Sequence, residues 1–163
     1  MNVLLCVDHS SASQKAVAFA AGLLGKCTVP NLQVTLFHVA ELLPEYVLAD
    51  ETSHGMTSRS LAEAWGTRSL AEGEKLLQAH QTELQTAGVP VEKIQRKLST
   101  MNCLPAAKKV AAALALIQEI QTGKYDVVCI GRRGASQMAS SIIGGVAEKV
   151  IRECQGKTVW LVD

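Results

Sequence analysis

Four glycines between residues 131 and 145 form the segment of this sequence best suited to chemistry. Gly131, Gly134, Gly144 and Gly145 lie between an apolar run and a stretch with helical periodicity. Glycine lets the backbone approach a phosphate closely, and the free N–H groups and dipole at a helix start attract negative charge. The segment therefore predicts an anion-binding loop between a buried strand and a helix. Glycines that only make turns are the alternative interpretation of this spacing.

The spacing of apolar residues places this loop in an alternating α/β fold. Continuous apolar runs at 3–8 and 126–130 are typical of strands buried on both faces of a parallel sheet. Further strands are expected at 32–39, 91–98 and 158–162, and helices at 11–25, 70–88, 105–123 and 146–154. Strict alternation implies right-handed crossovers, with helices on both faces. We expect a single domain over residues 1–163 with a five-stranded parallel doubly wound sheet, strand order 3-2-1-4-5.

Local signals refine this outline. Ser11-Ala-Ser-Gln14 is typical of a capping box at the start of the first helix. Three basic residues within 91–98 indicate an edge strand. Residues 41–60 lack periodicity, which predicts a long connection.

The carboxyl ends of the two most apolar strands, the expected central pair, carry the next candidate residues. In such sheets ligands bind beyond these ends, where the winding direction reverses. Asp8 is thus expected near Gly131 as a ligand contact, or alternatively as an acceptor for N–H groups of the following turn. Arg132 and Arg133 are candidates to clamp phosphate, with solvated side chains as the alternative, and contact is expected of Arg132. His9, His38 and Asp8 are the candidate metal ligands, but three ligands at unproven distances are weak evidence, so no metal site is expected.

The composition limits which class of protein this can be and which partners it can bind. Sixteen Lys and Arg against fifteen Asp and Glu give a net charge of +1, which argues against nucleic acid or an acidic membrane as partner. The five cysteines include no C-x-x-C pair, and Cys6 and Cys129 lie in apolar runs, which indicates core thiols in a reducing compartment. The apolar runs fall short of the ~20 residues that span a bilayer, and no basic leader is visible. We expect a cytoplasmic protein with no membrane association.

The glycine segment resembles the nucleotide-binding motif of the universal stress protein family, G-x2-G-x9-G followed by Ser or Thr. Gly131, Gly134 and Gly144 match this spacing in full. The resemblance covers nearly the whole chain, from Val-Leu-Leu-Cys-Val-Asp-His-Ser at 3–10, through Leu-Phe-His-Val39, to Gly-Val-Ala-Glu-Lys-Val150 and the last apolar strand. Breadth of this kind makes the resemblance specific.

The resemblance implies a stress or signalling module that binds an adenine nucleotide. In the family, the residues matching Asp8 and Val39 contact the adenosine portion, and those matching Ile130 and Val146 line the same pocket. The implied ligand is ATP, with AMP or ADP as alternatives and magnesium as an accompanying ion. The expected binding residues are Asp8, Val39, Ile130, Gly131, Arg132, Gly134, Gly144, Gly145 and Val146.

Two departures from the family pattern leave alternatives open. Gly145 stands where binding members place a hydroxyl on a terminal phosphate, a loss of roughly 1 kcal/mol because the backbone N–H remains. Residues 99–102 replace the Gly-x-Pro turn that the family often has after strand three. The alternatives are a dimeric interaction protein that has lost nucleotide binding, and an enzyme. Because no nucleophile–base constellation and no P-loop stand out, any ATP hydrolysis should be slow.

The final strand predicts a partner. Thr-Val-Trp-Leu-Val at 158–162 ends the chain as an apolar edge that a second copy would cover. The family often pairs in this way. We therefore expect a homodimer through the C-terminal strand.

Overall fold

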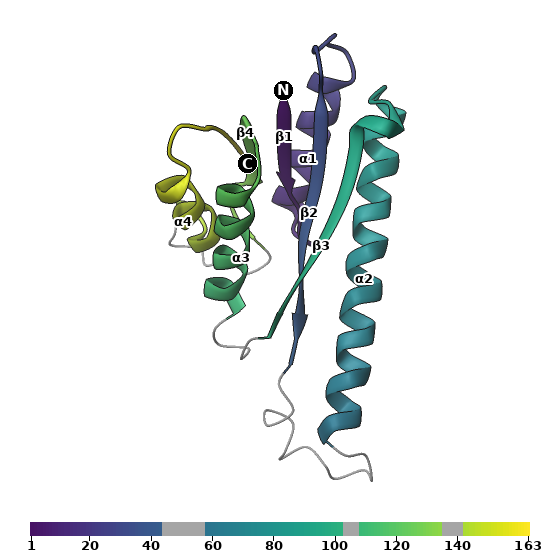
Figure 1. Ribbon diagram of the computed structural model, residues 1–163, viewed down its shortest axis with the longest axis vertical. Helices are drawn as coiled ribbons and strands as arrows, with labels where there is room; N and C mark the ends of the chain where they lie inside the picture. Colours follow the sequence, from purple (N-terminus) through teal and green to yellow (C-terminus); the bar gives the residue numbers. More distant parts are fainter. Residues whose placement is uncertain (44–57, 103–107, 135–141) are drawn as a thin grey trace.

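Five parallel strands form one sheet in the order β3-β2-β1-β4-β5, with β1 at its centre (Figure 1). The computed structural model describes residues 1–43, 58–102, 108–134 and 142–163. Its strands are β1 (Asn2–Cys6), β2 (Gln33–Leu42), β3 (Ile94–Asn102), β4 (Val127–Gly131) and β5 (Thr158–Val162). The fold class, the strand order and the central pairing of β1 with β4 are as the sequence predicts.

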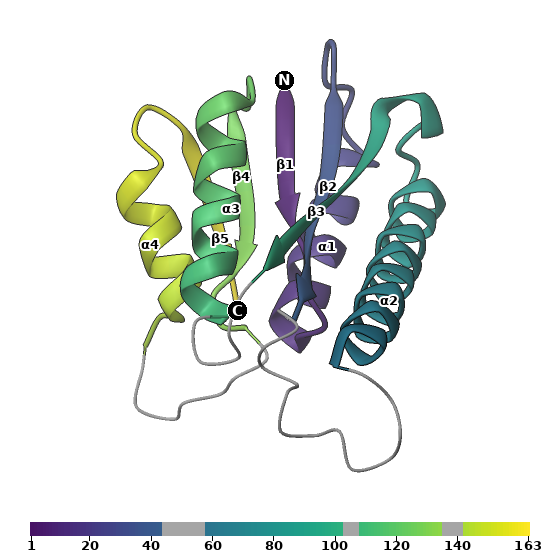
Figure 2. The same cartoon turned by 60° about the horizontal axis from the view of Figure 1, so that its bottom comes forward.

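Helices cover both faces of the sheet. They are α1 (Ser11–Leu24), α2 (Ser58–Thr86), α3 (Lys108–Thr122) and α4 (Gly145–Glu153), with a short 3-10 turn η2 (Val91–Lys93). In Figure 2, α3 lies in front of the sheet and α1 lies behind it. Two hydrophobic clusters result. Val3, Leu5 and Val7 pack with α1 and α2, whereas Leu4 and Cys6 pack with α3 and α4, because successive strand residues point to opposite faces.

The boundaries of the strands around β3 differ from the prediction. Strand β2 runs three residues past its expected end at Val39, and Val39–Leu42 pair in register with Ser99–Asn102. Those four residues therefore belong to a strand, and the predicted turn at 99–102 is wrong. The start of β3 moves to Ile94 because Pro90 leads into η2. Periodicity alone does not reveal such shifts.

The N-cap of the first helix lies one residue earlier than predicted. Ser10, in extended conformation, is the N-cap, and its hydroxyl accepts a hydrogen bond from the Ser13 N–H at 3.1 Å. The predicted cap, Ser11, is instead the first helical residue. The shift turns the Ser10 side chain inward, where it also meets Asp8.

A buried polar cluster attaches α3 to the sheet. Glu119 is only 7% exposed, and its carboxylate accepts hydrogen bonds from the Lys97 ammonium group and from the Tyr125 hydroxyl, the latter at 2.6 Å. Burial, with the hydrogen bond to Glu119, raises the pKa of Tyr125 to about 12. The sequence analysis did not predict this cluster, since an isolated Glu on a helix is usually solvated.

The thiols behave as core residues. Cys6 and Cys129 are buried, as predicted, and burial raises the pKa of both, that of Cys129 to about 12. Within the described ranges, none of the helices combines the length and the apolar character that crossing a bilayer requires.

Candidate functional site

The ends of the glycine loop are held together by backbone hydrogen bonds. The Gly144 N–H donates to the Arg132 carbonyl at 2.8 Å, and the Arg132 N–H donates to the Val162 carbonyl at 2.6 Å. Residues 135–141, the middle of the loop, lie outside the described residues. The Gly144 N–H is therefore engaged within the protein. The N–H groups that α4 can offer to an anion belong to its first turn, which begins at Gly145.

Gly131 lies against the start of α1. A Cβ atom at this position would lie 2.7 Å from the Ala12 carbonyl carbon and 2.9 Å from both the Ala12 oxygen and the Ser13 nitrogen. Real Cβ atoms do not approach backbone atoms this closely. Packing thus explains why glycine ends β4, whether or not a ligand is present.

Asp8 and Gly134 lie next to each other. One carboxylate oxygen of Asp8 accepts hydrogen bonds from the N–H and hydroxyl of Ser10, the former at 2.9 Å. A Cβ on Gly134 would lie 3.2 Å from the other oxygen. The turn-acceptor role of Asp8 is therefore realised by Oδ1, while Oδ2 faces the glycine loop.

The apolar residues of the predicted site gather on the α3–α4 side of the sheet. Ile130, 7% exposed, belongs to the hydrophobic cluster there, and Val39 and Val146 are half-buried against the same cluster. The structure thus brings together three residues that lie 91 and 16 positions apart in the sequence. All three therefore contact one hydrophobic cluster, and Val146 belongs to the first turn of α4.

Arg132 is engaged within the protein. Its guanidinium group donates to the Ile142 carbonyl at 3.1 Å and forms a salt bridge with Asp163. The hydrogen bond from Arg132 lowers the pKa of the Asp163 carboxyl. The side chain therefore joins the returning end of the loop to the residue that follows β5, and phosphate contact by Arg132 stays a prediction.

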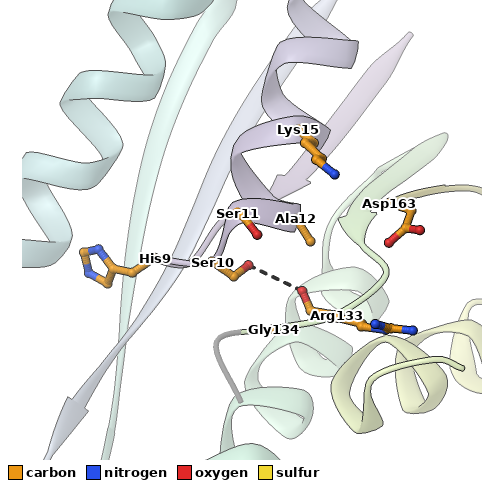
Figure 3. Close-up of a pocket in the computed structure, with 8 residues that line it drawn as sticks. All are labelled: His9, Ser10, Ser11, Ala12, Lys15, Arg133, Gly134 and Asp163. Atoms are coloured by element: carbon orange, nitrogen blue, oxygen red, sulfur yellow. Dashed lines mark hydrogen bonds between the residues drawn. The ribbon is translucent and has the colours of Figure 1, made fainter. Parts of the chain in front are cut away.

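A hollow of about 390 Å³ lies at the start of α1 (Figure 3). Its lining comes from the β1–α1 turn, the first turns of α1, the glycine loop and the residue after β5: His9, Ser10, Ser11, Ala12, Lys15, Arg133, Gly134 and Asp163. Of the nine predicted binding residues, only Gly134 lines it. Apart from His9, a candidate metal ligand, and Arg133, a possible phosphate contact, the other lining residues were not expected at a site, because no motif links them and only the sheet topology brings them together.

The two histidines near Asp8 meet without forming a metal centre. The rings of His9 and His38 pack edge to face with centroids 5.8 Å apart, and His38 Nδ1 lies 2.8 Å from the Val7 carbonyl oxygen. Burial lowers the pKa of His38, despite the opposing effect of that hydrogen bond. In the part of the chain that the structure describes, no three His, Cys, Asp or Glu side chains are placed to hold a metal ion.

Solved structures share this architecture across the full chain. Universal stress protein UspA from Lactobacillus plantarum superposes with a TM-score of 0.71 at 15% identity, covering 100% of this chain and 97% of that one. Hypothetical protein MJ0577 gives 0.73 at 17% identity, covering 99% and 94%. A universal stress protein in complex with cAMP gives 0.59 at 19% identity, covering 100% and 97%. At these identities the likeness establishes the fold.

Sequence comparison identifies the family. A search among curated proteins returns no match. The model of the universal stress protein family, in contrast, matches residues 1–162, which is nearly the entire chain. The chain therefore belongs to the universal stress protein family.

Proposed function

We propose that this protein is a cytoplasmic nucleotide-binding module whose ligand is an adenine nucleotide, ATP foremost, with AMP or ADP as alternatives. The observation that carries the proposal is the spacing of Gly131, Gly134 and Gly144, combined with the position of Gly134 beside Asp8. A related universal stress protein has been solved in complex with cAMP, which supports an adenine nucleotide as the class of ligand.

The described residues fit a ligand with an apolar end and an anionic end. The apolar side chains of Val39, Ile130 and Val146 suit a base, and Asp8 Oδ2 is an acceptor for a ribose hydroxyl. The first turn of α4 offers N–H groups to phosphate oxygens. Magnesium, where present, would bind through the phosphates rather than through a preformed protein site.

Thermal-shift titration with ATP and AMP tests the proposal. We expect either nucleotide at millimolar concentration to raise the Tm, since a ligand that binds only the folded state stabilises it. Gly144→Val should abolish the shift, because a Cβ there already lies 3.2 Å from the Arg132 carbonyl oxygen and 3.3 Å from the Arg133 Cα.

Two further variants make the titration decisive. Gly134→Val places its side chain against Asp8 from an exposed position, so it should also abolish the shift without disturbing the core. Gly22→Ala, in open space on α1, is the matched control and should respond as the wild type does. No stabilisation of correctly folded wild-type protein by either nucleotide would defeat the proposal.

Gly145→Ser should strengthen binding of ATP about fivefold. A Cβ at this position meets nothing within 4 Å, so the serine fits at the first position of α4. Its hydroxyl supplies one additional hydrogen bond to a terminal phosphate, worth about 1 kcal/mol. Isothermal titration calorimetry measures the effect, with Gly145→Ala as the control that adds the Cβ alone. Equal affinities of the Ser and Ala variants would contradict this role of the hydroxyl.

We further propose that two copies pair through β5. This strand is at the edge of the sheet, with Leu161 37% exposed and Val159, Trp160 and Val162 half-buried. An apolar edge strand of this kind is commonly covered by a second strand. Light scattering at tens of micromolar should report a dimer, and Leu161→Lys should convert it to a monomer. A wild-type protein that is monomeric under these conditions would remove the pairing.

A further inference from the structure

The hollow at the start of α1 carries more positive than negative charge. Lys15 and Arg133 line it, and Arg132 reaches the same Asp163 carboxylate from the other side. Arg132, Arg133 and Lys15 all act on the Asp163 carboxylate. The Asp8 carboxylate, bonded to Ser10 and next to Gly134, adds a second negative charge, which leaves one positive charge in excess. In Figure 3 the ammonium group of Lys15 and the guanidinium group of Arg133 extend to the side of the hollow where Asp163 lies, whereas His9 points away.

The polar groups of this hollow are incompletely paired. The Arg133 Nε atom is shielded from solvent and has no hydrogen-bond acceptor among the described residues. Neither Lys15 nor Arg133 forms a salt bridge within the described ranges. Because a shielded guanidinium nitrogen without an acceptor is costly, the Arg133 Nε–H is a donor available to an anion in the hollow.

The backbone adds to the positive potential. Helix α1, of 14 residues, begins at this hollow and has no acidic residue in its first turn, and the Asp8 carboxylate bonded to its N-cap Ser10 offsets only part of its dipole. The Ser10 hydroxyl caps the Ser13 N–H, and Ser11 and Ala12 line the hollow with the helix start. The Ser10 hydroxyl also approaches the Arg133 carbonyl at 3.4 Å, which holds the glycine loop beside the helix.

We propose that this hollow binds a phosphate-class oxyanion, and that the Asp163 carboxylate is an internal counter-ion that competes with it. The volume of about 390 Å³ admits an ion of pyrophosphate size. The Asp163 side chain is 62% exposed and follows the last strand, so it can leave the cations when a stronger anion arrives. Only Gly134 is shared with the predicted nucleotide residues, and the site does not depend on nucleotide binding.

Titration with inorganic pyrophosphate at low ionic strength tests the site. Asp163→Asn should bind about fivefold more tightly than the wild type, because the competing charge is gone and a similar shape remains. Lys15→Met should bind about tenfold more weakly, the loss of one charge-assisted hydrogen bond. Lys26→Met, which removes an exposed lysine beyond the far end of α1, is the matched control and should equal the wild type.

Arg133→Met gives an independent measurement, and it should also weaken pyrophosphate about tenfold. Binding of adenosine, which has no phosphate, should be unchanged in Lys15→Met and Asp163→Asn. Equal pyrophosphate affinities of the wild type, Lys15→Met and Asp163→Asn would overturn the site while leaving the nucleotide proposal untouched. Absence of adenosine binding, with the expected order of pyrophosphate affinities among the variants, would defeat only the nucleotide proposal.

Discussion

Gly25→Ala should lower the free energy of unfolding by about 3 kcal/mol. Gly25 caps the C-terminus of α1, and a Cβ there would lie 1.9 Å from the Ala87 carbonyl oxygen and 2.6 Å from its carbon. These are backbone atoms at the end of α2, so no rotamer change relieves the clash. The C-terminal turns of α1 and α2 must separate for the alanine to fit. Chemical denaturation monitored by circular dichroism measures the loss.

Gly22→Ala is the matched control for this substitution. It lies three residues earlier in the same helix, where a Cβ meets nothing within 4 Å. Alanine at an exposed helical position should raise stability by about 1 kcal/mol, since glycine disfavours the helix. The two variants should therefore shift the denaturation midpoint in opposite directions. A Gly25→Ala protein as stable as the wild type would contradict the close contact between the helix ends.

Gly131→Ala should cost about 2–3 kcal/mol of stability and also weaken pyrophosphate binding at the start of α1. The new methyl group would press on the backbone of Ala12 and Ser13, the first turn of α1. This turn carries part of the lining of the hollow, and Asp8 is attached to it through the hydrogen bond from the Asp8 N–H to the Ser13 hydroxyl at 3.0 Å. Packing and ligand binding should therefore change together.

Chemical denaturation and pyrophosphate titration of the same Gly131→Ala preparation show whether stability and ligand affinity fall together or whether stability alone is lost. Gly145→Ala provides the comparison, because its Cβ enters open space at the other end of the glycine loop. That variant should keep the stability of the wild type. If Gly131→Ala were as stable as Gly145→Ala, the glycine at the end of β4 would have to be explained by ligand contact alone.

The order of the sheet was predictable because apolar spacing and strand alternation depend on neighbouring residues. Val3–Val7 and 126–130 are apolar on both faces, which marks the centre of a parallel sheet, and β1 and β4 lie there. The ends of β2 and β3 were not predictable in the same way. Their last residues pair with each other, and this pairing outweighs the polar composition of Ser99–Asn102.

The same distinction applies to the candidate site: contacts that follow from the order of the strands were predictable, and contacts between other distant parts of the chain were not. The approach of Asp8 to the glycine loop follows from the topology, since both come after central strands. The partners of Arg132 do not, because Asp163 and Ile142 reach it from elsewhere in the chain. No sequence pattern indicated that Lys15 lines a site, because an isolated lysine on a helix is usually solvated. Its importance comes from the turn of α1 on which it lies.

The hydrogen bond between Gly144 and Arg132 has a consequence for how this protein tolerates change. It joins the two ends of the segment between Arg132 and Gly144. Doubling the length of a segment closed in this way costs only about 0.6 kcal/mol of chain entropy. An insertion between Gly134 and Gly144 should therefore cost little stability while it removes the glycine spacing on which the nucleotide proposal rests.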